Sequence, residues 1–263
     1  MFTVIFPSDY FNKNKVEETF ENQAEALSLL GIEHACINID DIKNICLPKN
    51  LKGKNILYRG WMLTRDGYEA LYAQLLEGDV NMLINPTEYI QSHYLPSWYD
   101  KISDLTPETV VYDYDDDMID KVFSLEWGEY FIKDYVKSLS TEQSPIVKSK
   151  DELQALLLNM EKFRDGVEGG VCVRRVEQIA PESERRYFVL NGVPFGSEGC
   201  NAKIPDIVSE CASRLVSKFY AVDIVKNKSG VDMVIEIGDG QVSDLKEWSP
   251  ERFCKMLMKG MNG

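Results

Sequence analysis

The stretch that most constrains this chain is Ala221–Gly240, whose sequence AVDIVKNKSGVDMVIEIGDG predicts a β-hairpin. Two apolar-biased segments flank NKSG, a cluster of residues that favour chain reversal. Asp223 interrupts the first strand, and Glu236 and Asp239 lie near the end of the second. Carboxylates are depleted in strands, and a buried one needs a cation or hydrogen-bond donors beside it.

Two interpretations of these carboxylates stay open at this point. In the first, Val, Ile and Met flank Asp223 and Glu236, so acids converge from paired strands and form a site for a hard cation such as Mg²⁺ together with a phosphate ligand. In the second, the hairpin faces solvent and its acids, with Asp232 beside the turn, are scattered surface charges. The hairpin by itself does not separate the two.

Length and charge narrow the classes of function. The chain has 263 residues, enough for one or two compact lobes with a substantial core. Its 43 acidic and 29 basic residues give a net charge of −14. Because phosphate contacts need a basic face, this balance argues against a general nucleic-acid binder, although a local basic pocket for a nucleotide is compatible with it.

The N-terminus and the cysteines predict a soluble, cytoplasmic protein. MFTVIFPSDYF lacks the basic and long apolar regions of a signal peptide, and no run approaches the roughly 18 apolar residues of a membrane helix. The six cysteines include no C-x-x-C pair, as expected for reduced thiols. With only His34 and His93, the chain has little material for a histidine-based metal site.

The first 110 residues alternate between strand and helix patterns, which predicts an open α/β unit with parallel strands. FTVIF, IEHACINI and GKNILYRGWML are the expected strands, and Lys15–Leu30 is the first expected helix. Ligands gather at the carboxyl ends of such strands, where Arg59, Gly60 and Trp61 follow NILY. Arg59 could bind a ligand anion there, or it could cap a helix or pair with an acid.

A second candidate for substrate contact is His93, in the segment TEYIQSHYLPSWYDKI. Aromatic residues at helical spacing are usually core, and a lone histidine among them is usually structural, so that alternative is kept. The acidic cluster Asp113–Asp117 is predicted to be a solvated turn. We place a boundary near it, which gives a preceding domain at 1–110 and a second module at 111–263.

The second half carries lysines in an unusual setting. Lys133 lies in the aromatic, β-favouring segment EYFIK, and Lys137 follows four residues later. A lysine in a buried strand costs free energy unless an anion meets it, so this is a candidate phosphate contact; a solvent-facing edge strand is the alternative. Asn191 and Gly192 predict a second hairpin, and a helix is expected over residues 203–219.

Common nucleotide and hydrolase motifs are missing from the sequence. It contains no G-x-x-x-x-G-K-[ST], no G-x-G-x-x-G after the first strand and no G-x-S-x-G. It does contain an ordered series: the Lys133 strand, a strand that reaches Glu177, the segment Glu184–Gly192, and the carboxylate hairpin. In this order and strand context the chain resembles the ATP-grasp superfamily, over about Tyr130–Gly240.

The resemblance implies a fold and a nucleotide site. The expected fold is α/β, with two α+β lobes that hold ATP between them and, in the first 110 residues, a Rossmann-like preceding domain. Lys133 and Lys137 match the lysines that contact the ATP phosphates. The backbone of the interlobe hinge near 177–180 would face adenine, and Glu184 stands where an acid binds the ribose hydroxyls. The expected hinge residues are Glu177, Gln178 and Ile179.

The resemblance also implies a catalytic arginine and metal ligands. Arg186 stands where an arginine stabilises the transferring phosphoryl group, and Asp223 and Glu236 match the metal-binding acids. The family's last metal ligand is an asparagine two residues after the glutamate, and that position here is Gly238. We expect Asp239 to replace it.

One clade of the superfamily, named for an arginine and two lysines, shows the strongest resemblance. The segments that carry it are R-G-W at Arg59, the lysines Lys133 and Lys137, and E-I-G-D-G. The side of the molecule built from the preceding domain would bind substrate, through Arg59, Trp61 and His93.

The resemblance implies an ATP-dependent ligase that uses Mg²⁺, with two ions expected. A carboxylate would attack the γ-phosphate to form an acyl phosphate, and an amine would then displace phosphate. The partners would be amino-acid or peptide-like carboxylates and amines, with no nucleic acid and no membrane. Such an intermediate needs protection from water, and we expect the polar loop Ser138–Ser144 to help cover it.

Two other functions stay open. Gly238 in place of asparagine is compatible with a nucleotide-binding protein of weak or no catalysis that serves as a sensor or interaction module. The chain could also be an α/β scaffold without a nucleotide. The sequence does not indicate an oligomeric state.

Overall fold

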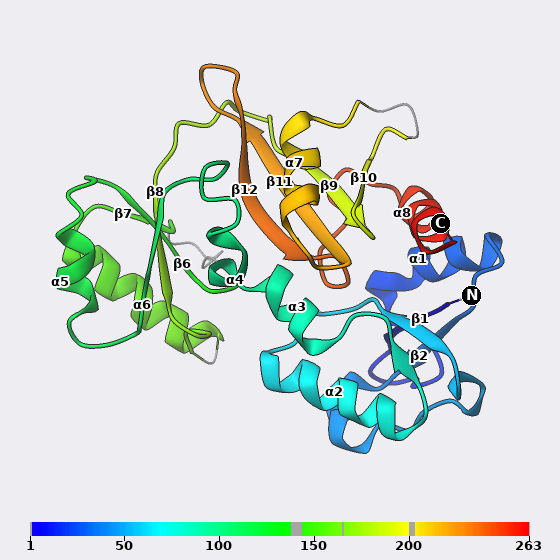
Figure 1. Ribbon diagram of the computed structural model, residues 1–263. Coiled ribbons are helices and arrows are strands. Elements are labelled where there is room, and N and C mark those ends of the chain that lie inside the picture. The colour runs from blue at the N-terminus through cyan, green and yellow to red at the C-terminus, as the bar shows by residue number, and fades with distance from the viewer. Residues whose placement is uncertain (1, 138–143, 165, 200–202, 263) are drawn as a thin grey trace. The chain divides into compact units, whose positions relative to one another are not determined.

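The computed structural model describes residues 2–137, 144–164, 166–199 and 203–262 (Figure 1). The strands are β1 Thr3–Pro7, β2 His34–Ile37, β3 Asn55–Tyr58, β4 Asn81–Met82, β5 Thr109–Tyr112, β6 Tyr130–Asp134, β7 Ile146–Val147, β8 Val171–Arg175, β9 Arg185–Leu190, β10 Val193–Gly196, β11 Phe219–Lys226 and β12 Asp232–Asp239. The α-helices are α1 Glu18–Leu29, α2 Arg65–Glu77, α3 Pro86–His93, α4 Leu95–Tyr99, α5 Met118–Phe123, α6 Lys150–Arg164, α7 Asp206–Arg214 and α8 Pro250–Asn262. Two short 3₁₀ helices, η1 Ile39–Asn44 and η2 Lys49–Leu51, complete the set of described elements.

The chain forms two compact units that do not follow the order of the sequence. Unit 1 comprises Met1–Ser92, Arg185–Val222 and Gly238–Gly263. Unit 2 comprises His93–Glu184 and Asp223–Ile237. Strands β11 and β12 each contribute residues to both units, so the predicted carboxylate hairpin is divided between them. The boundary near residue 110, which separates a preceding domain from a second module along the sequence, stays a prediction.

The front of unit 1 is a parallel sheet of strand order β2-β1-β3-β4. This confirms the expected parallel α/β arrangement. Its central strand β1 is fully buried, with Val4 opposite His34 on one side and Leu57 on the other. The Thr64 side chain caps the start of α2 by accepting a hydrogen bond from the backbone N–H of Gly67 at 3.2 Å.

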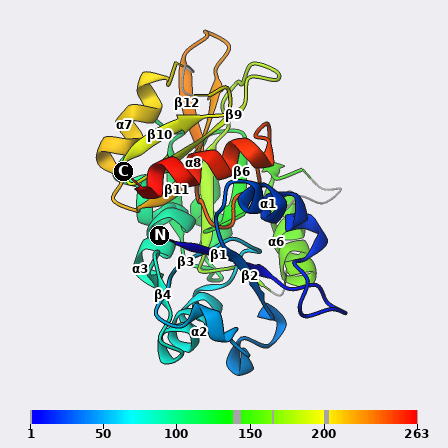
Figure 2. The ribbon, with the colours of Figure 1, turned by 90° about the vertical axis from the view of Figure 1, so that its right-hand side faces the viewer.

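A single hydrophobic core joins the front sheet of unit 1 to the C-terminal helix. Helix α8 packs against α1, and the two lie side by side in Figure 2. The aromatic rings of Phe188, Phe219 and Phe253 pack within 5.1–6.2 Å of one another in this core. Segments at opposite ends of the sequence therefore bury one another's apolar faces, and neither forms a separate core.

Unit 2 contains an antiparallel sheet of order β5-β8-β6-β7. Helices α5 and α6 contact each other, and their apolar side chains join the sheet in a core that includes Met118, Leu156, Met160 and Ile132. The sheet register places Lys133 opposite Cys172 and Phe131 opposite Arg174. Directly opposed residues share a face of an antiparallel pair, so Lys133 and Arg174 project from the same face.

A further sheet has the order β10-β9-β11-β12. The predicted Asn191-Gly192 hairpin is confirmed: both residues have positive φ, 51° and 76°, as a tight two-residue turn requires, and Leu190 pairs with Val193. The helix expected over 203–219 is shorter, because α7 ends at Arg214 and β11 begins at Phe219. The strand that was expected to reach Glu177 is also shorter, because β8 ends at Arg175.

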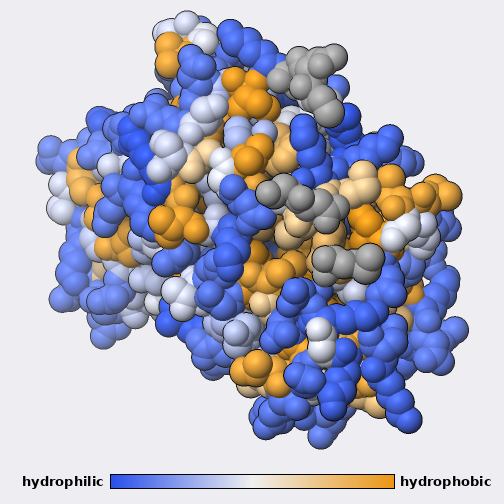
Figure 3. All heavy atoms as spheres, turned by 45° about the vertical axis from the view of Figure 1, so that its right-hand side comes forward, coloured by the Kyte–Doolittle hydropathy of each residue, from blue (hydrophilic) through white to orange (hydrophobic). Residues whose placement is uncertain are grey.

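Some expectations concern the surface and the thiols. In Figure 3 hydrophilic side chains cover most of the face shown, with apolar side chains in separate patches. Asp113–Asp117 is exposed, as predicted for a solvated turn.

The five cysteines within the described ranges are free. Among the described helices, none is long and apolar enough to cross a membrane. The predicted covering loop lies outside the described residues except for Ser144.

Candidate functional site

The structure brings together two predicted site residues of unit 2, Lys133 and Glu236. Lys133 Nζ lies 3.1 Å from Glu236 Oε1. The lysine side chain is 6% exposed, whereas the glutamate side chain is 40% exposed. The lysine is thus held in a buried strand by an anion, and the carboxylate keeps an accessible side on which a cation could bind.

Arg174 on β8 is part of the same site and was not identified from the sequence. Its guanidinium is buried and donates to the Thr106 hydroxyl at 2.6 Å and to the Ile235 carbonyl at 2.5 Å. Burial lowers the pKa of Arg174 to about 10, and the nearby charge of Glu236 opposes that shift. Arg174 therefore fixes β12 next to Glu236 and adds positive charge beside it.

A tight turn after β6 determines the backbone position of Lys137. The buried Asp134 carboxylate accepts hydrogen bonds from the backbone N–H groups of Val136 at 2.7 Å and Lys137 at 2.6 Å. This arrangement is the turn that aspartate side chains favour. Lys137 itself is exposed. The sequence contained an indication of this turn, because Asp134 is a turn-favouring residue at the end of an otherwise apolar strand.

His93 is close enough to the lysines for their charges to affect it. Its side chain is 5% exposed, and burial first, then the charges of Lys133 and Lys137, lower the pKa of His93 to about 3. The imidazole is therefore neutral at physiological pH and adds no charge to the site.

The residues expected around the nucleotide base and ribose lie along one exposed connection of unit 2. Glu177 and Gln178 are exposed, and Ile179 is 43% exposed. The Gln178 carbonyl accepts a hydrogen bond from the backbone N–H of Lys228 at 3.0 Å, so this connection is held against the β11–β12 turn. Glu184 is also exposed and directly precedes β9. Their roles toward a nucleotide stay predictions.

The carboxylates of unit 2 fit Mg²⁺ that is bound mainly through a phosphate ligand. Asp223 on β11 is 1% exposed, and Glu236 lies on the neighbouring strand. Within the described part of the chain, no group of three or more His, Cys, Asp or Glu could hold a metal by itself. Mg²⁺ is commonly held by one or two carboxylates plus phosphate oxygens and water, which needs no larger protein cage.

Asp239, the expected third ligand, belongs to unit 1 and is fully buried. Its Oδ1 accepts hydrogen bonds from the backbone N–H of Gln241 at 2.9 Å and from the Gln241 side chain at 3.0 Å, and its Oδ2 accepts one from the Ser92 hydroxyl at 3.0 Å. Burial raises the pKa of Asp239 to about 7, against the opposing effects of these hydrogen bonds and of Arg59. Both oxygens therefore have protein donors.

Arg59 is 2% exposed and binds the protein backbone. Its guanidinium donates to the side chain of Gln23 at 2.8 Å and to the carbonyls of Gln241 at 2.9 Å and Ser243 at 2.6 Å. It also lies 4.7 Å from the centroid of the Phe253 ring. Arg59 thus fastens the segment after β12 to the front sheet. The sequence suggested a ligand anion, a helix cap or an acidic side chain as the partner of Arg59, and it did not identify these backbone carbonyls.

Trp61 remains more accessible than Arg59. Its side chain is 48% exposed, its indole N–H donates to Glu17, and its ring meets Phe20 edge to face at 5.4 Å. Between Arg59 and Trp61, Gly60 allows a close approach, because a Cβ there would lie 2.4 Å from the Tyr58 hydroxyl. Trp61 stays a predicted substrate contact.

Arg186 on β9 is buried and faces the segment after β12. Its guanidinium donates to the Asp244 carboxylate and, at 2.8 Å, to the Asp244 carbonyl. The Asp244 side chain is 76% exposed, so a solvent-borne anion could compete for this arginine. The backbone of Arg186 is fixed by Glu247, whose carboxylate accepts a hydrogen bond from the Arg186 N–H at 2.8 Å.

Comparison with known families gives one match over most of the second half. Residues 104–257 match the model of an ATP-grasp domain, family 3 of the clade named for one arginine and two lysines (R2K_3). No curated protein matches the chain.

Solved structures share the fold over nearly the whole chain. The D-cycloserine synthetase DcsG has a TM-score of 0.65 and 12% identity, and the match covers 98% of this chain and 99% of that one. The D-alanyl-alanine synthetase A from Vibrio cholerae has a TM-score of 0.64 and 12% identity, with 100% and 98% covered. The ATP-grasp ligase PsnB has a TM-score of 0.58 and 12% identity, with 98% and 96% covered. At this identity the likeness shows the fold.

Proposed function

The chain belongs to the ATP-grasp domain family just described, and from that premise we propose that it joins a carboxylate to an amine through an acyl phosphate. Enzymes of this family are ATP-dependent ligases. The proposed reaction begins when the substrate carboxylate attacks the γ-phosphate of ATP and releases ADP. An amine then attacks the acyl phosphate, which forms the amide and releases phosphate.

The observation that carries this proposal is the pair of Lys133 and Glu236 in unit 2. A buried lysine and a half-exposed carboxylate 3.1 Å apart combine a donor for phosphate oxygens with an oxygen ligand for Mg²⁺. Binding of MgATP would place phosphate on Lys133 and metal on Glu236, so each partner would exchange one charged contact for another.

Mg²⁺ would be held by Asp223 and Glu236 together with the phosphates, and when bound it would offset charge that develops on the transferring phosphoryl group. We propose two ions, as in the sequence hypothesis. Arg174 would keep Glu236 in place through its hydrogen bond to the Ile235 carbonyl. Asp239 stays a predicted ligand, and its protein donors favour a structural role.

Other residues of the chain would position the nucleotide and the reacting groups. Lys137, exposed beyond the Asp134 turn, would donate to phosphate oxygens. Glu184 would accept hydrogen bonds from the ribose, and the connection 177–179 would bind adenine through its backbone. Arg186 would exchange its exposed partner Asp244 for the transferring phosphoryl group.

The proposed substrates are amino acids or peptides. This follows the names of structurally similar proteins: D-alanyl-alanine synthetase A, PsnB complexed with a precursor peptide, and the macrocyclase MdnC bound with the precursor peptide MdnA. Trp61 and the neutral His93 are the proposed contacts to the carboxylate substrate, and Arg59 would act by holding the backbone of the segment after β12.

A second candidate function is nucleotide binding without turnover. It is favoured by Gly238, which removes the family's asparagine ligand, and by the protein donors that already occupy Asp239. Such a protein would bind MgATP and respond by a change of conformation or partner. The two candidates share a nucleotide site and differ in whether ADP is formed.

A screen of amino acids, peptides and amines for stimulated ADP release from MgATP tests the proposal. We expect ADP release to depend on an added carboxylate, and the coupled product to appear by mass spectrometry when an amine is also present. Thermal stabilisation by MgATP without ADP release across the screen would favour the second candidate. If ATP gives no Mg²⁺-dependent stabilisation, the nucleotide site itself is wrong.

A further inference from the structure

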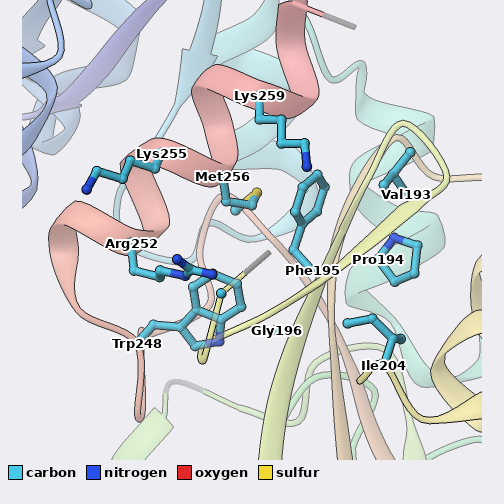
Figure 4. A pocket seen from close by; sticks show the side chains of 11 residues that line it. Val193, Pro194, Phe195, Gly196, Ile204, Trp248, Arg252, Lys255, Met256 and Lys259 are labelled. Carbon is cyan, nitrogen blue, oxygen red and sulfur yellow. The ribbon is translucent and has the colours of Figure 1, made fainter. Parts of the chain in front are cut away.

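A groove in unit 1 lies outside the residues assigned above. Helix α8 forms one wall and β10 the other, and the cavity between them has a volume of about 170 Å³. Trp248 and Met256, each 4% exposed, contribute apolar surface together with Phe195 and Ile204 (Figure 4). We call this cavity and its rim the α8 groove.

Three cations line the rim of the α8 groove. Arg252, Lys255 and Lys259 project from α8, as Figure 4 shows. Their spacing of three and four residues places them along one face of the helix. Across the described residues, none of the three forms an ion pair with an acidic side chain. Glu251 on the same helix is near enough to Lys255 for their charges to interact, yet three cations on one helix face are an unusual concentration of positive charge in a chain with a net charge of −14.

Arg252 lies in the first turn of α8, where a positive charge destabilises a helix. A cation near the C-terminal end of a helix is favourable, which suits Lys259 in the last turn. Arg252 is the third residue of α8, where the helix dipole disfavours positive charge, and it is also half-buried. Its guanidinium lies against Gly199, where a Cβ would be 2.4 Å from Nη2, so the glycine leaves room for it. An anionic ligand on Arg252 would offset these costs.

The size of the cavity distinguishes classes of ligand. Pockets for cofactors and drug-sized molecules are about 300–1,000 Å³, so this cavity suits a single side chain better than a whole small molecule. The cations extend over seven residues of helix, or roughly 10 Å at about 1.5 Å per residue. An extended peptide covers that length in about four residues at roughly 3.3 Å each.

The adjacent strand indicates how such a peptide would be recognised. Strand β10 is the outer described strand of its sheet, and Val193 on it is 50% exposed. Pro194 in the middle of β10 has no backbone N–H, which makes the strand a poor template for addition of another strand. Recognition would therefore depend on side chains in the cavity and on the cationic rim.

We propose that the α8 groove binds an extended acidic peptide segment, with one apolar side chain in the cavity and carboxylates on Arg252, Lys255 and Lys259. The apolar floor and the row of three cations match an occupant that carries both chemistries within about four residues. This inference goes beyond the ligase proposal and does not rest on it, because none of the residues involved is assigned to ATP or metal.

The test is selection from a display library of random eight-residue peptides on the full chain, without nucleotide. We expect the selected peptides to share an apolar residue flanked by at least two acids. The best peptide, carrying a neutral fluorophore, is then titrated by fluorescence anisotropy at low and high salt. Affinity should fall at least about tenfold in the triple variant Arg252→Glu, Lys255→Glu, Lys259→Glu, and it should fall with added salt.

A matched control removes the effect of net charge. Lys43→Glu, Lys49→Glu and Lys52→Glu make the same change at exposed lysines of unit 1, and we expect peptide affinity within twofold of the parent. Phe195→Ala, which removes no cation but does remove the ring that lies 6.0 Å from Lys259 Nζ, should weaken binding by reducing the apolar contact. Circular dichroism melts verify folding of each variant, and Arg252→Gln replaces the triple variant if that one does not fold.

Several results would overturn the inference. Selection of no peptide, or of peptides without acids, excludes an acidic occupant. Equal loss of affinity in the two triple variants assigns binding to net charge alone. Displacement of the peptide by millimolar inorganic phosphate identifies a site for a small anion. A protein mass that rises with concentration by light scattering, but not in the groove variant, identifies a second copy of the chain as the occupant.

Discussion

Glu236 and Asp239 lie three residues apart on strand β12, yet their environments are opposite. The Glu236 side chain is 40% exposed and pairs with one buried lysine. Asp239 is fully buried and accepts three hydrogen bonds from two neighbouring residues, Gln241 and Ser92. One carboxylate can bind an incoming cation, whereas the other is already bound by the protein.

The same contrast holds for the basic residues around them. Among the described residues, Lys133 donates to one side chain, that of Glu236, which a ligand could replace. Arg59 is held by backbone carbonyls that no ligand replaces without disturbing the fold. Each pair carries the same sign of charge on, or directly after, a strand, so the identity of the partners, and for the carboxylates also burial, decides which residue is available for function.

The largest effect is expected at Lys133. Lys133→Ala should reduce ADP release by about 10²–10³-fold, because a positioned donor to the phosphates is lost. Lys148→Ala is the matched control, since Lys148 forms an exposed ion pair with Glu129. Steady-state kinetics and ATP titration measure both variants. Parent-level ATP affinity in Lys133→Ala would show that Lys133 is not a phosphate contact.

Arg59→Ala should act on stability. The substitution removes the guanidinium donor from the Ser243 carbonyl and from the Gln241 carbonyl, which keeps the backbone N–H of Gly60, and we expect the free energy of unfolding to fall by roughly 3 kcal/mol. Urea denaturation measures this change. Arg175→Ala, which breaks an exposed ion pair with Glu108, should cost at most about 0.5 kcal/mol. Unchanged stability combined with lost substrate binding would instead make Arg59 a ligand contact.

The paired variants Glu236→Gln and Asp239→Asn compare the two carboxylates directly. ATP at about 100 times its Kd stabilises a protein by roughly 2.7 kcal/mol, and Glu236→Gln should abolish the Mg²⁺-dependent part of this stabilisation. Asp239→Asn should retain it, because the aspartate already has protein partners. Thermal shifts with ATP, with and without Mg²⁺, decide the question. Loss of the Mg²⁺ effect in Asp239→Asn would establish Asp239 as a ligand.

The smallest effect concerns pH. The pKa of Asp239 is raised from 3.8 to about 7, so the folded chain binds its proton more tightly than the unfolded chain does. Stability from this group is therefore lost as pH rises through that interval, by about 1 kcal/mol between pH 6 and 8. Melting temperatures of the parent should fall relative to Asp239→Asn over this range. Asp116→Asn, at an exposed site, should follow the parent.

Much of the candidate site followed from local patterns. A lysine in an apolar strand predicted an anionic partner for Lys133, and the carboxylates of the Ala221–Gly240 hairpin predicted Glu236 as a metal ligand; the structure places these two side chains in contact. Arg174 was missed because its strand carries two adjacent arginines, and only sheet register shows which of them is buried. Gln241 was missed because its side chain joins Asp239 to Tyr68, and Tyr68 lies 173 residues away in the sequence.

The α/β class, the hairpins and the family resemblance could be predicted from the sequence alone, because strand period, turn residues and motif order are local properties. Three features required the folded chain: Arg59 binds backbone, the Asp239 carboxylate is occupied by protein donors, and α8 shares a core with the front sheet. These features depend on which distant segments bury one another. That choice is made by packing of the whole chain, and no short stretch of sequence encodes it.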